Sequence, residues 1–148
     1  MKNIKRLVKQ FRDAIDVARD KGNFDNDFSF SKFPRGCCGD TSDLLAQFLL
    51  ENSIRTYYVC GMCRGQSHAW LLTYNNSIII DITGDQFKDN SDFLNYEKSV
   101  YIGFEDDFHR LFKVESMNIR ENIGLDALGG TCQPRLNKLY NKIVKYIQ

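Results

Sequence analysis

Three short runs rich in β-branched and aromatic residues follow one another in the middle of the chain, and they constrain the fold more than any other feature. We expect strands over Arg55–Cys60, His68–Tyr74 and Ser77–Ile82. Asn75-Asn76 should turn the chain between the second and third strands. The unbroken apolar run Ile78–Ile80 lacks the alternation of a half-exposed strand, which predicts a central strand covered on both faces.

Apolar residues at helical spacing flank this strand-rich region on both sides. The pattern predicts an amphipathic helix over residues 2–20 and a second helix over residues 38–52. A third helix is expected near the C-terminus, because Leu136–Ile147 carries apolar residues at the same spacing and Pro134 lies near its first turn.

The segment between the third strand and the C-terminal helix has a weaker pattern. Gln86–Tyr96 is consistent with a short helix and Val100–Phe104 with a further strand, whereas residues 105–130 fit no single element. The chain contains no internal repeat, low-complexity tract or linker. We therefore predict one α+β domain over residues 1–148, with a small antiparallel sheet packed against helices.

The composition excludes several classes of protein. A hydrophobic fraction of 43% and an aromatic fraction of 13% are typical of a globular chain. Twenty basic and nineteen acidic residues leave a net charge of +1, which indicates neither a nucleic-acid nor a membrane partner. The five cysteines cannot all pair, and neither a secretory signal nor a run of about 18 apolar residues is visible. We expect a reduced cytoplasmic protein, although export without a signal peptide would leave no mark in the sequence.

Three motifs in chain order supply a thiol, an imidazole and a carboxylate: Gly36–Asp40 (GCCGD), Ser67–Trp70 (SHAW) and Ile80–Thr83 (IDIT). A thiol is nucleophilic only as the thiolate, an imidazole can take its proton, and a carboxylate can orient that imidazole. If the second helix begins near Cys38, the sulfur lies beside the first free N–H groups of the helix. These groups favour the thiolate and can donate to an oxyanion.

The expected strand pairing brings the imidazole and the carboxylate together. With a turn at Asn75-Asn76, position 68 lies opposite about position 83, and position 70 lies opposite 81. His68 and Asp81 are therefore near one another, and we expect a one-residue adjustment or a bulge to bring them to the same face.

The motifs in this order resemble the transglutaminase-like branch of the papain fold. In that family a Gly-x-Cys begins a helix, a His-Ala-Trp lies on a strand, and an Asp-x-Thr lies on the next strand. The matching residues are Gly36-Cys37-Cys38, His68-Ala69-Trp70 and Asp81-Ile82-Thr83. Val59-Cys60-Gly61 resembles the strand-end glycine of the family, and the likeness covers about residues 33–87.

The resemblance implies a role for each member of the set. Cys38, rather than Cys37, is the implied nucleophile because the thiol of the family follows the glycine by two positions. His68 is the implied general base and then acid, and Asp81 orients it. Papain-like peptidases also carry a glutamine shortly before the cysteine as an oxyanion donor, and this chain has none between Gln10 and Cys38.

These expectations describe a cysteine-dependent hydrolase that cleaves amide or peptide bonds through an acyl-thioester. The substrate is expected to be a peptide or protein, and no cofactor or metal is expected. Protein-glutamine deamidation and transglutamination are alternatives, because the triad does not determine which acceptor reaches the thioester. Gln86 is a candidate oxyanion donor by residue type and position alone. The sequence does not indicate an oligomeric state.

A Cys-x-x-Cys motif, Cys60-Gly61-Met62-Cys63, supports a rival interpretation. With His68 and either Cys37 or Cys38 it would supply four zinc ligands, and alone it would form a redox pair. The chain lacks the second Cys-x-x-Cys of many zinc modules. A non-catalytic binding protein that uses the same cleft is a further alternative.

Four other features have simple structural interpretations. Cys132 and His109 stand alone in the sequence, and we expect both to be structural. Trp70 is expected in the core, shielding the imidazole from water, and Glu105–Asp107 is expected to be a solvated turn.

Overall fold

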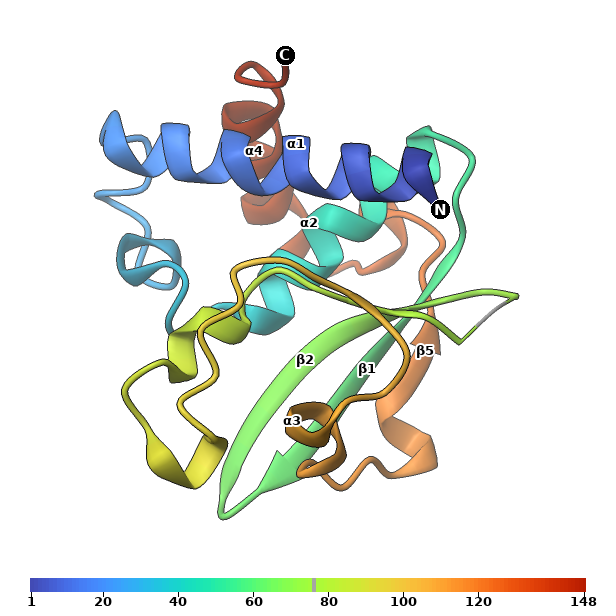
Figure 1. Cartoon of the computed structure of the whole chain (residues 1–148). Helices are drawn as coiled ribbons and strands as arrows, with labels where there is room; N and C mark the ends of the chain where they lie inside the picture. Colours follow the sequence, from blue (N-terminus) through green and yellow to red (C-terminus); the bar gives the residue numbers. More distant parts are fainter. Residues whose placement is uncertain (76) are drawn as a thin grey trace.

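The computed structural model describes residues 1–75 and 77–148. Over these residues the chain forms four α-helices and one antiparallel sheet of five strands (Figure 1). The helices are α1 (Lys2–Asp20), α2 (Cys38–Glu51), α3 (Asp107–Arg110) and α4 (Cys132–Val144). The strands are β1 (Thr56–Cys63), β2 (Gln66–Thr73), β3 (Ile79–Asp81), β4 (Tyr101–Gly103) and β5 (Ile119–Glu121), in the order β4-β3-β2-β1-β5. The fold is therefore α+β, as the sequence predicts.

Most of the strongly patterned elements lie where the sequence places them. The helices α1, α2 and α4 and the strands β1, β2 and β3 match their predicted ranges to within a few residues. The strand β3 lies between β2 and β4 and all three of its residues are buried, which confirms the central strand predicted from the run Ile78–Ile80. The predicted turn at Asn75-Asn76 includes residue 76, which lies outside the described residues.

The segment after β3 differs in detail from the prediction. Gln86–Tyr96 does not form one helix but contains the end of one 3₁₀ turn, Gly84–Phe87, and the whole of another, Ser91–Phe93. A side chain interrupts the segment, because the Asn90 side chain accepts a hydrogen bond from the backbone N–H of Asp92 at 3.1 Å and so starts the second turn. The predicted strand over Val100–Phe104 is present as β4.

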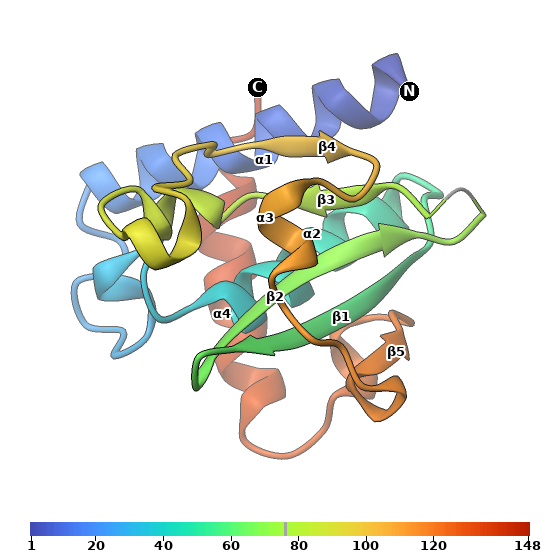
Figure 2. The same ribbon diagram turned by 60° about the horizontal axis from the view of Figure 1, so that its bottom comes forward.

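Two apolar clusters lie on opposite faces of the sheet. The helix α2 packs on one face, and α1 and α4 pack against α2 and each other (Figure 1). Figure 2 shows α3 and the chain around it in front of the other face. That second face holds a mainly aromatic cluster, which is made of Val59, Trp70, Ile79, Phe87, Phe93, Phe108 and Phe112. No helix in the described part of the chain is long and apolar enough to cross a membrane.

The strands β1 and β2 form a tight hairpin that is longer than the sequence predicts. Cys63 pairs with Gln66, so the loop has only two residues, Arg64 and Gly65. Both residues have positive φ angles, of 51° and 77°, as this type of hairpin turn requires. The prediction that Gly61 ends the first strand was wrong, because β1 continues two residues beyond it to Cys63.

Gly61 has a packing role inside the strand. A Cβ atom at this position would lie 2.7 Å from Phe112 Cβ and 3.1 Å from Val114 Cγ2, so the glycine lets the chain after α3 pack directly on β1. We expect Gly61→Ala to lower the free energy of unfolding by about 1–3 kcal/mol, as overpacking does. Urea denaturation measures it, with Met62→Ala at the neighbouring, 46% exposed position as control. Equal effects of the two substitutions would contradict this packing role.

Candidate active site

The register of β2 and β3 places the predicted imidazole and carboxylate on one face of the sheet. Leu71 pairs with Ile80 and Leu72 with Ile79. Continued by one step, this register puts position 70 opposite 81, which confirms the predicted pairing. Residues two apart on a strand share a face, so His68 and Asp81 face the same side without the bulge that we expected. The expected adjustment was wrong, because positions 68 and 70 already share a face and position 70 lies opposite 81.

A short hydrogen bond joins the two side chains in the protein interior. His68 Nε2 lies 2.7 Å from Asp81 Oδ2, and the two residues are 0% and 2% exposed. The other carboxylate oxygen, Oδ1, accepts hydrogen bonds from the Thr83 backbone N–H at 2.9 Å and from the Thr83 hydroxyl at 3.4 Å. The Asp-x-Thr sequence thus fixes the carboxylate, and the carboxylate fixes one nitrogen of the imidazole.

The two adjacent cysteines have different environments at the start of α2. Cys37 precedes the first residue of the helix, is buried, and its sulfur accepts a 3.7 Å hydrogen bond from the Thr41 hydroxyl. Cys38 is the first helical residue and is half-buried. Gly36, with a φ of 74°, makes the turn into the helix. Of the two thiols, Cys38 is the more accessible.

The two thiols also differ in how readily they ionise. Burial raises the pKa of Cys37 to about 12. Burial acts against the thiolate at Cys38 as well, but a hydrogen bond and charge interaction with His68, together with the Ala69 backbone amide, outweigh it, and the pKa of Cys38 is lowered. The N-terminus of α2 adds a positive dipole end beside this sulfur. Cys38 is therefore the thiol that ionises more readily.

The buried imidazole holds its proton more strongly than a free histidine. Burial lowers the pKa of His68, but the charge and hydrogen bond of Asp81, with a contribution from Cys38, raise it to about 9. Burial likewise opposes ionisation of Asp81, but the charge of His68 and the hydrogen bonds from His109 and His68 lower its pKa. Relative to isolated side chains, these shifts favour the ionised forms of Cys38, His68 and Asp81.

A glutamine amide lies beside the second ring nitrogen of His68. Gln86 Nε2 lies 3.2 Å from His68 Nδ1 and donates a 3.1 Å hydrogen bond to the Thr83 carbonyl. Gln86 and Cys38 both line one recess of about 470 Å³, together with the tip of the β1–β2 hairpin. The sequence suggested Gln86 by type and position alone, and the structure places its amide beside Cys38 and His68.

A buried arginine of α1 anchors the turn that carries Gln86. Arg12 is 5% exposed, and its guanidinium donates hydrogen bonds to the carbonyls of Ile82 at 2.7 Å and Ser99 at 3.1 Å. The same group pairs with both carboxylate oxygens of Asp85, at 3.0 and 2.8 Å. The first helix therefore fixes the backbone on both sides of Thr83.

No family model, curated protein or solved structure matches the chain. We therefore infer the function from the geometry and chemistry of the described residues.

His109 has partners that the sequence prediction of a lone structural histidine missed. Its Nε2 lies 2.8 Å from Asp81 Oδ2, and its Nδ1 lies 2.5 Å from Asp106 Oδ1. Asp106 also caps α3, because its side chain accepts a hydrogen bond from the His109 backbone N–H at 2.9 Å. The prediction of a solvated turn over Glu105–Asp107 was therefore wrong at Asp106. The signal available in the sequence was an Asp-x-x-His at a helix start, a spacing typical of a capped N-terminus.

The Cys-x-x-Cys motif does not form a paired site in the structure. Cys60 and Cys63 are three residues apart on β1, so their side chains point to opposite faces of the sheet. Cys60 lines a second recess beside Cys38, whereas Cys63 packs against the aromatic cluster. All five cysteines are free thiols. This placement does not support a zinc site or a redox pair that uses both residues.

One group of described residues has the donor types of a metal site. The donor atoms of His68, Asp81 and His109 all lie within 4.8 Å of one another, and two imidazoles with a carboxylate suit zinc. Each of the three side chains is hydrogen-bonded as described above, and all three are buried. Aromatic rings surround the group, among them Trp70, which is in the core as predicted with its ring 5.7 Å from His68. Hydrogen bonds account for this arrangement without an ion.

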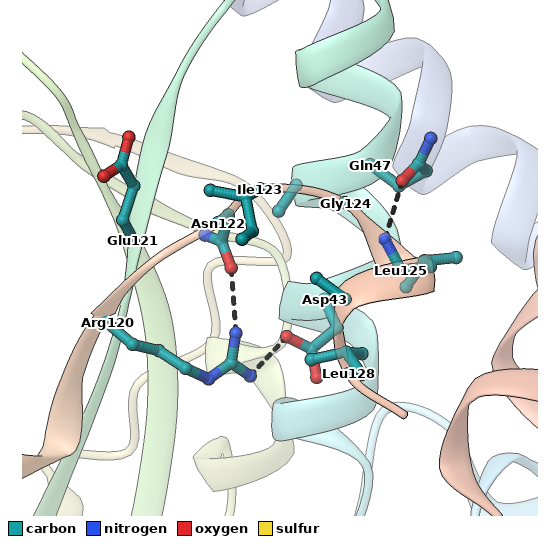
Figure 3. A pocket seen from close by; sticks show the side chains of 11 residues that line it. Asp43, Gln47, Arg120, Glu121, Asn122, Ile123, Gly124, Leu125 and Leu128 are labelled. Atoms are coloured by element: carbon teal, nitrogen blue, oxygen red, sulfur yellow. Dashed lines mark hydrogen bonds and ion pairs between the residues drawn. The ribbon is translucent and has the colours of Figure 1, made fainter. Parts of the chain in front are cut away.

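A further pocket, of about 200 Å³, lies between α2 and the chain around β5 (Figure 3). Its polar groups already have partners: Arg120 donates to Asp43 at 2.6 Å and to the Asn122 side chain at 3.1 Å, and Glu121 pairs with Arg55. Gln47 accepts a hydrogen bond from the Leu125 backbone at 2.9 Å. None of the three predicted catalytic residues lines this pocket, so the recesses beside Cys38 are the better candidate site.

Proposed function

We propose that this chain is a cysteine-dependent acyl-transfer enzyme that hydrolyses amide or peptide bonds, with Cys38, His68 and Asp81 as its catalytic residues. We further propose that its α+β fold is of the papain type, in the transglutaminase-like branch that its motifs resemble. The observation that supports this function most is the environment of Cys38. An accessible thiol with a lowered pKa interacts with a buried imidazole, whose other side is held by a buried carboxylate at 2.7 Å.

The proposed reaction has two half-reactions. The Cys38 thiolate attacks the carbonyl carbon of an amide, and the C–N bond breaks as His68 donates its proton to the departing amine. The acyl group is then a thioester on Cys38. His68, now neutral, takes a proton from water, and the resulting hydroxide adds to the thioester carbonyl. The acid is released, and the thiolate and imidazolium are restored.

Two groups in this site are suited to stabilise the negative oxygen that forms during attack. The first N–H groups of α2 have no partner within the helix and converge near Cys38. The amide of Gln86 lies in the same recess as Cys38. We assign Gln86 as the side-chain donor, in place of the glutamine that papain-like peptidases carry before their cysteine.

The molecule that takes the acyl group from the thioester distinguishes three related activities. Water gives hydrolysis of a peptide or amide, or deamidation when the substrate is a glutamine side chain, and a primary amine gives transamidation. We favour hydrolysis because both recesses beside Cys38 open to solvent. Peptides and protein amides can be compared for chain cleavage, ammonia release and incorporation of a labelled amine, each against Cys38→Ala.

Alkylation with iodoacetamide tests the proposed nucleophile without knowledge of the substrate. We expect Cys38 to react faster than the other four thiols at pH values well below the ordinary thiol pKa of about 8.5. The rate should rise with pH through the lowered pKa of Cys38. Mass spectrometry of digested protein across a pH series locates the modified cysteine, with the exposed Cys132 as the internal reference for an ordinary thiol.

A matched variant identifies the cause of that reactivity. His68→Ala removes the imidazole, and the alkylation rate of Cys38 should then fall to that of Cys132 at each pH. Cys37→Ala removes the neighbouring buried thiol and should leave the rate unchanged. Equal, slow labelling of Cys38 and Cys132 in the wild type would contradict the proposed triad and would favour a binding protein without catalysis.

A further inference from the structure

A second buried imidazole lies behind the carboxylate of the proposed triad. Asp81 Oδ2 is shared between His68 Nε2 at 2.7 Å and His109 Nε2 at 2.8 Å. The far nitrogen of His109 meets a second carboxylate, Asp106, at 2.5 Å. The side chains thus alternate between imidazole and carboxylate in the order His68, Asp81, His109, Asp106. The proposed hydrolysis does not itself require the last two.

The hydrogen-bond pattern determines how many protons His109 carries. An ionised carboxylate only accepts hydrogen bonds, and a neutral imidazole has one donor and one acceptor nitrogen. Both side chains accept further hydrogen bonds: Asp81 Oδ1 accepts from the Thr83 backbone N–H and hydroxyl, and Asp106 accepts from the His109 backbone N–H and the Tyr96 hydroxyl, as ionised carboxylates do. A ring held between two ionised carboxylates must donate from both nitrogens.

The surroundings of His109 are otherwise apolar or neutral. The residue is 1% exposed, and the rings of Trp70 on β2 and Tyr101 on β4 lie 5.0 and 5.3 Å from it. Tyr96 donates a hydrogen bond to Asp106 Oδ2 at 3.1 Å, and Lys98 lies over the rings of Tyr96 and Tyr101. The charged groups that face the ring are therefore the two carboxylates and, at a centroid distance of 6.3 Å, His68.

We propose that His109 is a doubly protonated positioning residue, clamped between Asp81 and Asp106, which orients the Asp81 carboxylate and keeps it ionised behind His68. The consequence for catalysis depends on the proposed function. The charge state of His109 does not depend on it, because it follows from the contacts with the two carboxylates.

The proposal predicts the direction in which the pKa of His68 changes when His109 is replaced. This direction distinguishes a charged His109 from one that only fills space. A positive ring 6.3 Å away opposes protonation of His68. If His109→Gln removes that charge while its amide still donates to Asp81, the pKa of His68 should rise above its value of about 9, by about one pH unit. If His109 only fills space, its loss loosens Asp81, and the pKa of His68 should fall toward about 6.5.

Nuclear magnetic resonance of the intact chain labelled with ¹⁵N-histidine tests the proposal. The chain has only two histidines, so the spectrum contains two rings, and His109→Gln assigns them. We expect His109 in the wild type to show protons on both nitrogens at neutral pH. The substitution Asp106→Asn keeps the size of the side chain but removes its charge. In this variant His109 should carry a proton on only one ring nitrogen. Titration of His68 in the wild type and in His109→Gln gives the shift.

Three results would overturn the proposal: a single ring proton on His109 in the wild type, two ring protons in Asp106→Asn, or an unchanged or lowered pKa of His68 in His109→Gln. The wild-type spectrum is decisive even if a variant does not fold. Alkylation of Cys38 is measured separately. Slow alkylation with a doubly protonated His109 would reject the enzyme but keep the clamp, and fast alkylation with a singly protonated His109 would reject the clamp alone.

Discussion

Replacing Cys38 by serine should reduce acyl transfer by roughly 10³-fold or more. The reason is the protonation state of His68. Burial lowers the pKa of His68, but Asp81, with a contribution from Cys38, raises it to about 9, so most of the imidazole carries its proton at neutral pH. It can stabilise a thiolate, but it is a poor base toward a serine hydroxyl, whose pKa is far above that of a thiol. The site therefore favours sulfur, and a serine at position 38 would remain a neutral alcohol.

An activated ester measures this effect before the natural substrate is known. Attack of Cys38 on p-nitrophenyl acetate breaks the ester C–O bond, releases p-nitrophenolate and leaves an acetyl thioester. Intact-mass spectrometry detects the acetyl group, and absorbance follows the release of p-nitrophenolate. Cys37→Ser is the matched control, because Cys37 is buried at the adjacent position with its pKa raised to about 12. Acetylation that persists in Cys38→Ser but disappears in Cys37→Ser would transfer the proposed role to Cys37.

The part of the candidate site that the sequence predicts depends on local structure. A strand, a short turn and a second strand determine their own register, and the parity of side chains then follows. His68 and Asp81 were therefore predicted to lie together, and they do at 2.7 Å. The start of the second helix near Cys38 follows from the apolar repeat and from Pro34, which delays the helix, and α2 begins at this residue.

The part that the sequence does not predict depends on contacts between distant segments. His109 follows Asp81 by 28 positions and lies on a helix of four residues, too short to give a periodic pattern. Its contact with Asp81 exists because the aromatic cluster holds α3 against the sheet. Gly61 is a similar case, since its role depends on Phe112 and Val114, which come from the same segment of weak pattern.

Arg12 shows the same limit on a helix whose position was predicted correctly. In the sequence it is one of several charged residues between the apolar positions of α1. In the structure it is buried, pairs with Asp85 at 2.8 Å and Asp16 at 3.1 Å, and lies over the Phe33 ring. Periodicity cannot distinguish a buried arginine from an exposed one, because Asp85 and the carbonyls of Ile82 and Ser99 come from segments far along the chain.

We expect Arg12→Ala to lower the free energy of unfolding by about 3–5 kcal/mol, as the removal of one partner from a buried ion pair does. The substitution leaves the Asp85 carboxylate and the Ile82 and Ser99 carbonyls without their donor. Urea denaturation measures the change, with Arg6→Ala on the exposed side of the same helix as control. Arg6 is exposed and donates hydrogen bonds to the side chains of Gln10 and Asn3, so the control should change little.

The same substitution should also weaken the proposed active site in the molecules that remain folded. Arg12 holds the backbone on both sides of Thr83, and this turn carries the Thr83 groups that bind Asp81 as well as the amide of Gln86. Alkylation of Cys38 at neutral pH should therefore slow in Arg12→Ala but not in Arg6→Ala, when both are measured well below their urea midpoints. Loss of stability with an unchanged alkylation rate would show that Arg12 supports the fold alone, and that Asp81 keeps its orientation without the anchor on α1.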